Sequence, residues 1–422
     1  MQRLLLLIIT ALIIVQCSKN PTPEKAELQE QPEHIFILNE TPEHIQDVEN
    51  LTVFPGDSEP HYSIELIPVQ AFGRDGEPYF TQISGSVMDD NGRVIIHDMG
   101  SNYEHSIYVY NSDGTYHAQI GGPGRGPGEH GFVFDVQAKV GKVFVRDITN
   151  QRLNIYNTND YSFDRSMLIE QLAIRDHEAA KGLRLGFIMV RNDGNHLVTF
   201  SQQGSDVHKY LLMDTNGNML NFDPIVFPSS LSISVPGRPM APSLILGHMM
   251  GQTLTTLNSE DAIYSIWTRD FLISKYDSNG IYRSAIYYPI QSLPFDIYEY
   301  TKTIPFRYDA LEIEKALVNM DIELPETNPI LDDLMVDDEN RIWAAVSMDG
   351  QRMNYEWWIL APSGELLAKL QRPREKTIFD IKNGYLYAKE IVEETGAEYV
   401  VKYRIEMSER VSSLKLRRPG KK

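Results

Sequence analysis

Cysteine is almost absent from this chain, since the 422 residues contain a single one, Cys17. One cysteine excludes an internal disulfide and the paired Cys ligands of structural zinc sites. Positive charge is also scarce, with 39 Lys and Arg against 58 Asp and Glu and a net charge of -19. Because this field repels phosphate backbones and no basic stripe interrupts the body of the chain, we expect no nucleic-acid partner.

Long apolar runs are missing except at the N-terminus, where Leu4 to Val15 follows Arg3. This run is too short to span a bilayer of roughly 30 Å, but it suits the core of a secretory signal peptide. The next residues, Ile14-Val15-Gln16-Cys17, resemble a bacterial lipobox, whose cysteine is acylated and becomes the mature N-terminus. Gln16 stands where lipoboxes usually have Gly, Ala or Ser. The alternatives are an uncleaved N-terminal anchor and a secretory signal cut elsewhere.

The two ends of the chain differ in composition from its body. We interpret residues 1–16 as the signal peptide and residues 17–60, rich in Pro, Glu, Gln and Asn, as a flexible tether anchored by lipid on Cys17. Residues 409–422 form a basic C-terminal tail. The folded body is therefore expected over residues 61–408, held at the membrane through Cys17.

Between these ends a degenerate unit recurs, built of short alternating strands separated by Asp/Asn-Gly turns. Its six copies begin at Gly85, Phe134, Ile188, Leu254, Asp333 and Ile378. Each unit is a small antiparallel meander that cannot bury both of its faces alone, whereas radial stacking gives every sheet two neighbours. The sequence predicts an all-β fold, a six-bladed β-propeller, in which Tyr62 to Ile67 closes the ring by pairing with the sixth copy.

One segment, residues 287–329 between the fourth and fifth copies, breaks this pattern. Residues 308–320 place Leu311, Leu317 and Val318 at helical spacing, which predicts a short amphipathic helix on an insertion. Such an insertion lies either over one face of the ring, where ligands enter, or in a gap between blades.

The most distinctive motif is the glycine-rich stretch from Ile120 to Glu129, between the first two copies. A phosphate-binding loop needs a helix after it, and here a strand follows. Gly126-Pro127-Gly128-Glu129 resembles instead the junction of NHL-type propellers, and more closely that of bacterial six-bladed β-propeller lipoproteins. In those proteins an aromatic residue follows the glutamate directly, whereas here His130 and Gly131 intervene before Phe132. The resemblance implies a ring of blades, lipid-anchored outside the inner membrane.

Residues able to carry chemistry are few, and we predict no catalytic constellation. The junction loop leads toward the centre of the ring, so Arg125, Glu129 and His130 are candidate ligand-binding residues. Related propellers include metal-dependent lyases and lactone hydrolases, and a corresponding metal set here would contain His97, Asp98 and His130. No other cofactor is expected. The acidic stretches 89–92 and 337–340 lack the ligand spacing of calcium loops and predict hairpin turns.

These observations favour a binding or interaction module in the bacterial cell envelope, at the outer membrane or on the periplasmic face. Its membrane partner would be reached through the lipid on Cys17, and its ligand would be a peptide, a glycan or an envelope protein. The alternative is a metal-dependent lyase or hydrolase of the NHL-propeller kind. A third possibility is a structural element of an envelope complex.

Overall fold

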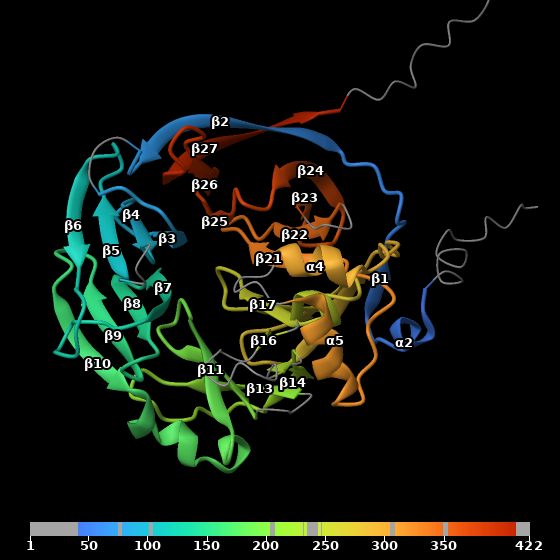
Figure 1. Ribbon diagram of the computed structural model, residues 1–422, viewed down its shortest axis with the longest axis horizontal. Helices are drawn as coiled ribbons and strands as arrows, with labels where there is room; N and C mark the ends of the chain where they lie inside the picture. Colours follow the sequence, from blue (N-terminus) through green and yellow to red (C-terminus); the bar gives the residue numbers. More distant parts are fainter. Residues whose placement is uncertain are drawn as a thin grey trace, which may run out of the picture.

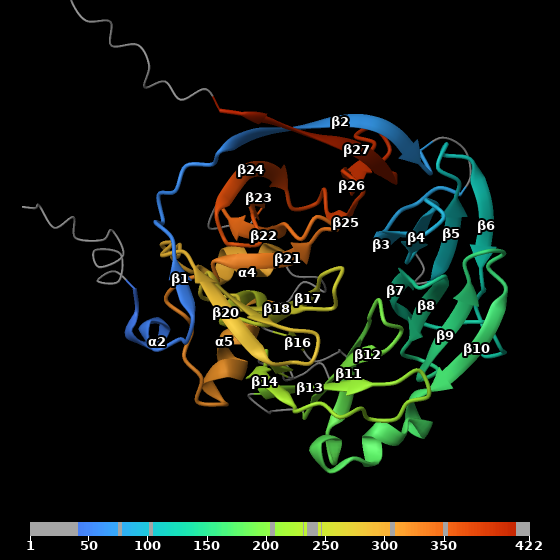
Figure 2. The same ribbon diagram turned by 180° about the vertical axis from the view of Figure 1, so that it is seen from behind.

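Six antiparallel sheets stand around a common axis in the computed structural model of the chain (Figures 1 and 2). The structure describes residues 41–74, 78–100, 104–202, 207–230, 232–233, 244–245, 247–303, 309–348 and 353–410. Each sheet contains four antiparallel strands, which follow chain order outward from the axis except for the last strand of the closing sheet, and one sheet carries an additional parallel strand at its outer edge. The predicted six-bladed propeller is confirmed, and we name its blades A to F.

From the axis outward, blade A contains β3 (Ile83–Met88), β4 (Val94–Asp98), β5 (Ser106–Tyr110) and β6 (Tyr116–Ile120), and blade B contains β7 (Val133–Lys139), β8 (Lys142–Asp147), β9 (Arg152–Asn157) and β10 (Phe163–Leu168). Blade C contains β11 (Arg184–Val190), β12 (His196–Ser201), β13 (Val207–Met213) and β14 (Ile225–Pro228), and blade D contains β17 (Thr253–Leu257), β18 (Ile263–Trp267), β19 (Leu272–Tyr276) and β20 (Tyr282–Tyr287). Blade E contains β21 (Leu331–Val336), β22 (Ile342–Ser347), β23 (Asn354–Leu360) and β24 (Leu366–Pro373), and blade F contains β25 (Ile378–Lys382), β26 (Tyr385–Ile391), β27 (Glu398–Glu409) and β2 (Tyr62–Phe72).

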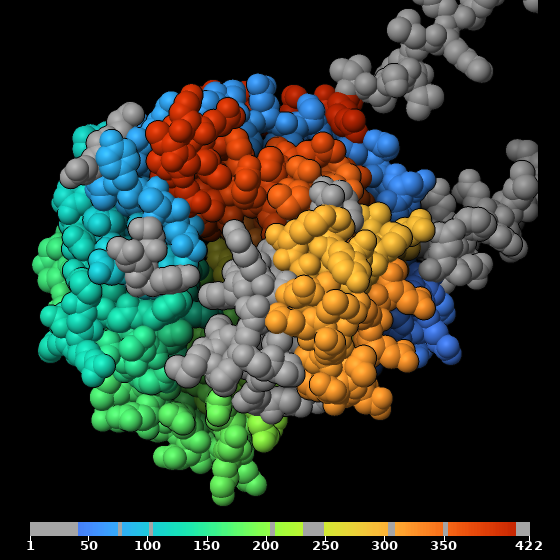
Figure 3. All heavy atoms as spheres, in the orientation of Figure 1, coloured from blue at the N-terminus to red at the C-terminus, as the bar shows by residue number. Residues whose placement is uncertain are grey.

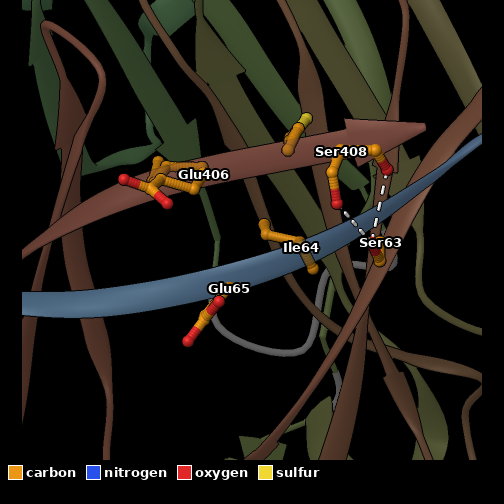
Figure 4. Close-up of a pocket in the computed structure, with 7 residues that line it drawn as sticks. Ser63, Ile64, Glu65, Glu406 and Ser408 are labelled. Carbon is orange, nitrogen blue, oxygen red and sulfur yellow. Dashed lines mark hydrogen bonds between the residues drawn. The ribbon is translucent and has the colours of Figure 1, made fainter. Parts of the chain in front are cut away.

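The ring closes through blade F, which combines both ends of the propeller. Strand β2 pairs antiparallel with β27 along its length, from Tyr62 opposite Glu409 to Phe72 opposite Val400. The predicted closing strand is therefore confirmed. The two strands form a long ribbon, and its free end carries a shallow pocket where Ser63 hydrogen-bonds Ser408 with 2.8 Å between the hydroxyl oxygens (Figure 4).

Hydrophobic burial is concentrated between blades, because each sheet has apolar side chains on both faces. One buried cluster fills each of the six blade interfaces, and Trp358 in blade E packing on Phe271 in blade D is one example. The second strand of a blade, such as β4 or β8, is buried on both sides along most of its length. Stacking in the ring therefore buries both apolar faces of each sheet, which a single repeat cannot do alone.

The two faces of the ring differ. One, the turn face, carries the first hairpin turn of every blade, and the other, the connector face, carries the longer segments that lead from one blade to the next. The connector between blades B and C holds short 3-10 turns, η1 (Ile169–Gln171), η2 (Ala173–Asp176) and η3 (Glu178–Ala180). That between blades C and D holds β15 (Ser232–Ile233), β16 (Leu244–Ile245) and α3 (Gly247–Met250).

On the turn face, a carboxylate at the start of the hairpin organises several turns. Asp89 accepts hydrogen bonds from the Asn91 and Arg93 amides, both at 2.9 Å, and Asp337 accepts from the amides of Glu339 and Arg341. Both acidic stretches are turns, as predicted. Polar contacts then join neighbouring turns all the way round the ring. They are Asp90–Gly141 (A to B), Lys139–Asn192 (B to C), Asn192–Asp261 (C to D), Ser259–Asn340 (D to E), Asp338–Asn383 (E to F) and Lys382–Asp90 (F to A).

The insertion between blades D and E is helical, as predicted, with α4 (Ile297–Thr303) and α5 (Ala310–Val318). Both helices lie over the connector face beside the axis, in front of the blades in Figure 1 and behind them in Figure 2. Figure 3 shows the insertion, in orange, raised on that face. The predicted apolar stripe is wrong in part. Leu317 is buried, but Leu311 and Val318 are exposed, because α5 turns Ile313 and Ala316 instead toward a small core shared with Met249.

The N-terminal segment departs from its interpretation as a tether up to residue 60. Residues 41–60 contain α2 (Glu43–Gln46) and β1 (Leu51–Val53), and β1 pairs in parallel with β20 as a fifth strand of blade D. Phe54 then stacks on Tyr288 with ring centroids 5.2 Å apart. Apolar residues in this stretch, Ile45 and Val53, bury themselves on the ring, which explains the ordered path. Cys17 and the signal segment lie outside the described residues, and no helix within those residues is long and apolar enough to cross a bilayer.

Candidate functional site at the axial end of blades A, B and C

The glycine-rich junction joins β6 to β7 on the connector face and folds back on itself. The His130 amide donates to the Gly122 carbonyl at 2.8 Å, and the Gly124 amide donates to the His130 carbonyl at 3.0 Å. The Glu129 carboxylate accepts from the Gly126 amide at 2.6 Å. Gly128 has φ +74° and packs against Phe163, so a side chain there would be both strained and crowded.

Strand β9 holds this junction in place through alternate side chains on one face. Arg152 donates to the carbonyls of Arg125 and Glu129, and Asn154 donates to the Glu129 carbonyl at 2.9 Å. The Tyr156 hydroxyl donates to the Gly128 carbonyl at 2.8 Å. The loop therefore uses several of its polar groups to attach blade A to blade B.

The three ligand-binding candidates from the sequence have different surroundings. The Arg125 side chain is exposed, and the exposed Glu129 uses its carboxylate within the loop. His130 is fully buried and donates from Nε2 to the His105 carbonyl at 3.1 Å. These contacts place His130 inside the junction and leave only Arg125 pointing its functional group to solvent.

The structure brings His97 and His130 together, with His105 between them. His97 Nε2 lies 2.8 Å from His105 Nδ1, the two rings stack at 5.1 Å, and all three imidazoles are at most 3 % exposed. Burial, followed by the proximity of the other two imidazoles, lowers the pKa of His97 to about 3. Burial also lowers the pKa values of His105 and His130, so the cluster is neutral at physiological pH.

Asp98, the third residue of the candidate metal set, has a separate role. Its carboxylate accepts from the Gln82 amide at 3.1 Å and so fixes the start of β3, while burial raises its pKa. Over the described part of the chain, no three His, Cys, Asp or Glu side chains are grouped to hold a metal ion. Two imidazole ligands of one zinc ion would have nitrogens roughly 3.4 Å apart, from Zn–N bonds of about 2.0–2.1 Å. The contact between His97 and His105 is shorter than that and is a hydrogen bond.

A second group of residues, which the sequence did not single out, lies where the innermost strands of blades B and C begin. Phe134 on β7 and Phe187 on β11 are 46 % and 52 % exposed, yet their ring centroids are only 5.3 Å apart. Two exposed phenylalanines from neighbouring blades thus form one apolar surface beside the axis. Nearby, Gln137 bridges the blades, because its side chain donates to the Ile188 carbonyl and accepts from the Val190 amide.

An acidic and a basic residue face each other across the two inner strands of blade B. Asp135, next to Phe134, accepts from Gln137, and burial raises its pKa. Arg146, its cross-strand neighbour on β8, is 6 % exposed, and its Nε and Nη1 atoms have no hydrogen-bond partner within the described structure. Burial lowers the pKa of Arg146 to about 10. Both donor atoms are buried, and the nearby carboxylates of Asp147 and Asp135 offset part of the cost of holding this cation inside the blade.

The sequence feature that could have predicted this site is a residue type that recurs at one position of the repeat, rather than a contiguous motif. In blades B, E and F the innermost strand has a bulge after its first residue, and an aspartate follows: Asp135, Asp333 and Asp380. Burial raises the pKa of all three and brings that of Asp333 to about 6. Aligning the six units on their first strand would have shown this recurrence and placed Phe134 beside it.

Comparison with known proteins agrees with this architecture. Residues 77–209, which span blades A and B and blade C as far as the beginning of β13, match a family model described as a 6-bladed beta-propeller. The chain is a six-bladed β-propeller. A member of the duf4221 family from Bacteroides vulgatus has the same fold, with a TM-score of 0.52 and 13% identity over 82% of this chain and 100% of that one.

Two further solved structures are more distant. A protein from Bacteroides fragilis that is thought to be exported gives a TM-score of 0.49 and 12% identity over 85% of this chain and 100% of that chain. Virginiamycin B lyase from Staphylococcus aureus gives a TM-score of 0.39 and 10% identity over 81% of this chain and 99% of that chain. No curated protein matches the propeller significantly. At these identities the likeness concerns the fold alone.

Proposed function

We propose that this propeller is an exported, lipid-anchored binding protein whose ligand sits at the axial end of blades B and C. The observation that carries the proposal is the exposed pair Phe134 and Phe187 on adjacent innermost strands. Monomeric proteins seldom expose neighbouring aromatic rings unless another molecule covers them. Asp135, adjacent to Phe134 on the same innermost strand, adds a carboxylate at this end of blade B.

The chemistry of this surface fits a peptide or a glycan. Aromatic rings stack on the apolar face of a sugar or on an apolar side chain. Asp135 offers acceptor oxygens for hydroxyl or amide donors. The flanking insertion, which carries α4 and α5 on the same face, adds further surface beside the axis (Figure 3).

The test is binding of the full chain, purified in detergent, to a peptide array and a glycan array. The double variant Phe134→Ala/Phe187→Ala should lose at least 10-fold in affinity for whatever the native chain binds, because a stacked aromatic contact contributes about 1–3 kcal/mol. Tyr116→Ala is the matched control, since Tyr116 is 52 % exposed on an outer strand. Equal binding by the native chain and the double variant would refute the proposed site.

The lipid anchor is tested separately through Cys17. Cys17→Ser should move the protein from the membrane fraction to the soluble fraction and abolish incorporation of an alkyne-labelled palmitate. A variant that stays in the membrane fraction without the label would show an uncleaved apolar anchor. Release of the unmodified native chain into the medium would show a signal cut elsewhere.

A further inference from the structure

Ser84 is the residue at the bulge of β3, and its surroundings differ from those of an ordinary surface serine. Its side chain is exposed at the axial end of blade A, yet its Oγ lies 2.9 Å from Nδ1 of the buried His97. The bulge places both Ser84 and Gly85 opposite His97 on β4, which turns the hydroxyl back onto the imidazole. An exposed hydroxyl is therefore joined to a buried nitrogen.

The hydrogen-bond chain continues beyond His97. His97 Nε2 contacts His105 Nδ1 at 2.8 Å, and the His105 ring packs on Phe132 with centroids 4.3 Å apart. When Ser84 donates to Nδ1 of His97, the His97 Nε2–H donates to His105, and both contacts are satisfied by neutral rings. Nucleophile, base and an orienting third group thus stand in the order of a serine–histidine relay, with an imidazole in the place of the usual carboxylate.

Room for a substrate exists beside the hydroxyl. A Cβ added at Gly85 would meet no atom of the described residues within 4 Å, so this part of the structure leaves space next to Ser84. Strand β3 is the edge strand of blade A, and within the described residues no strand pairs with its axial edge.

We propose that Ser84 is a nucleophile toward small carboxylic esters, with His97 as its general base and His105 as a positioning residue. The Ser84 Oγ attacks the ester carbonyl while its proton passes to His97 Nδ1. The tetrahedral intermediate collapses, the C–O bond to the alcohol breaks, and the alcohol leaves with the proton from His97. Water then attacks the acyl-serine by the same route and releases the acid, which restores Ser84.

This activity is independent of the ligand site at blades B and C, so either proposal can fail alone. The first experiment treats the full chain in detergent with a fluorophosphonate probe and maps the adduct by peptide mass spectrometry. We expect the adduct on Ser84. Ser63 is the internal control in the same sample, because it is an exposed serine paired with the Ser408 hydroxyl rather than with an imidazole (Figure 4). Labelling of Ser84 no faster than Ser63 would overturn the proposal without any variant.

Variants then test the roles with p-nitrophenyl acetate as substrate. Ser84→Ala should abolish the hydrolysis, whereas Ser63→Ala should leave it unchanged. His97→Ala should slow labelling of Ser84 by about 100-fold, the usual contribution of a general base. For His105, the Leu variant should slow labelling, and the Asn variant, which places an acceptor near the former Nδ1, should restore most of it. Ser84 that labels at the native rate in His97→Ala would assign the contact a purely structural role.

Discussion

Asp333 stands on the innermost strand of blade E with its carboxylate hydrogen-bonded to the Leu334 amide at 2.8 Å, and burial raises its pKa from 3.8 to about 6. Replacing it with asparagine removes the ionisable group but keeps an oxygen that can accept from Leu334. Because the unfolded chain ionises this carboxyl near its ordinary pKa, the folded state is penalised whenever the pH exceeds that value. The variant is therefore expected to be more stable at neutral pH.

The magnitude follows from the two pKa values. Each pKa unit corresponds to about 1.36 kcal/mol, so ionised Asp333 costs the folded state up to about 3 kcal/mol at pH 7.5. Below pH 3.8 both states are protonated and the cost vanishes; at pH 4.5 it is about 1 kcal/mol. Solvent screening reduces both figures, because Asp333 is partly exposed. We expect Asp333→Asn to gain about 1–3 kcal/mol at pH 7.5 and less than half of that at pH 4.5.

Urea unfolding followed by tryptophan fluorescence measures this difference. Trp343, Trp357 and Trp358 lie in blade E and Trp267 in the neighbouring blade D, so the signal reports on the part of the ring that contains Asp333. Asp338→Asn is the matched control, because Asp338 is exposed on the turn face of the same blade. A gain that is absent at pH 7.5, or equally large at pH 4.5, would refute the reasoning about the buried carboxylate.

Three further changes test the contacts that hold the ring together. Glu390→Ala should cost about 3–5 kcal/mol in urea, because Glu390 binds the buried Arg372 at 2.7 Å and its loss leaves that charge unpaired; a cost below 1 kcal/mol would contradict this. Gly128→Ala should lower the thermal stability of the chain more than Gly384→Ala does. Both glycines have positive φ, but only at Gly128 would the added methyl group meet Phe163. Equal losses of stability would show that backbone strain alone matters. Asp261→Ala should cost about 1–3 kcal/mol because the Asn192 and Asp193 amides lose their acceptor, whereas Ser259→Ala at an exposed turn contact should cost less than about 0.5 kcal/mol; the reverse order in urea unfolding would contradict the arrangement.

Much of the fold could be predicted from the sequence because it depends on local chemistry. The Asp/Asn-Gly turns and alternating strands of each unit set a small meander, and a meander with two apolar faces must stack. The closing strand at Tyr62 and the helix near residue 310 followed from the same patterns. The local pattern could not predict which face of that helix is buried. Leu311 and Val318 fit an apolar stripe, but the position of Met249 decided that Ile313 faces inward.

The tether boundary was missed for a similar reason. Residues 41–60 are polar and rich in proline, which favours an extended chain, and only the outer edge of blade D offered a strand for β1 to join. The sequence of residues 41–60 alone does not predict that this strand edge lies nearby. A short segment with two or three apolar residues becomes ordered when a preformed surface supplies the remaining contacts.

The candidate sites show the same division. The sequence determined the six-bladed ring and singled out the junction at Gly126 to Glu129, because turn residues and strand periodicity act over a few positions. Tertiary structure alone decided that His105 stands between His97 and His130, that Ser84 contacts His97, and that Phe134 meets Phe187. The contacts of His130 with His105 and of Phe134 with Phe187 join neighbouring blades, whose alignment depends on closure of the whole ring.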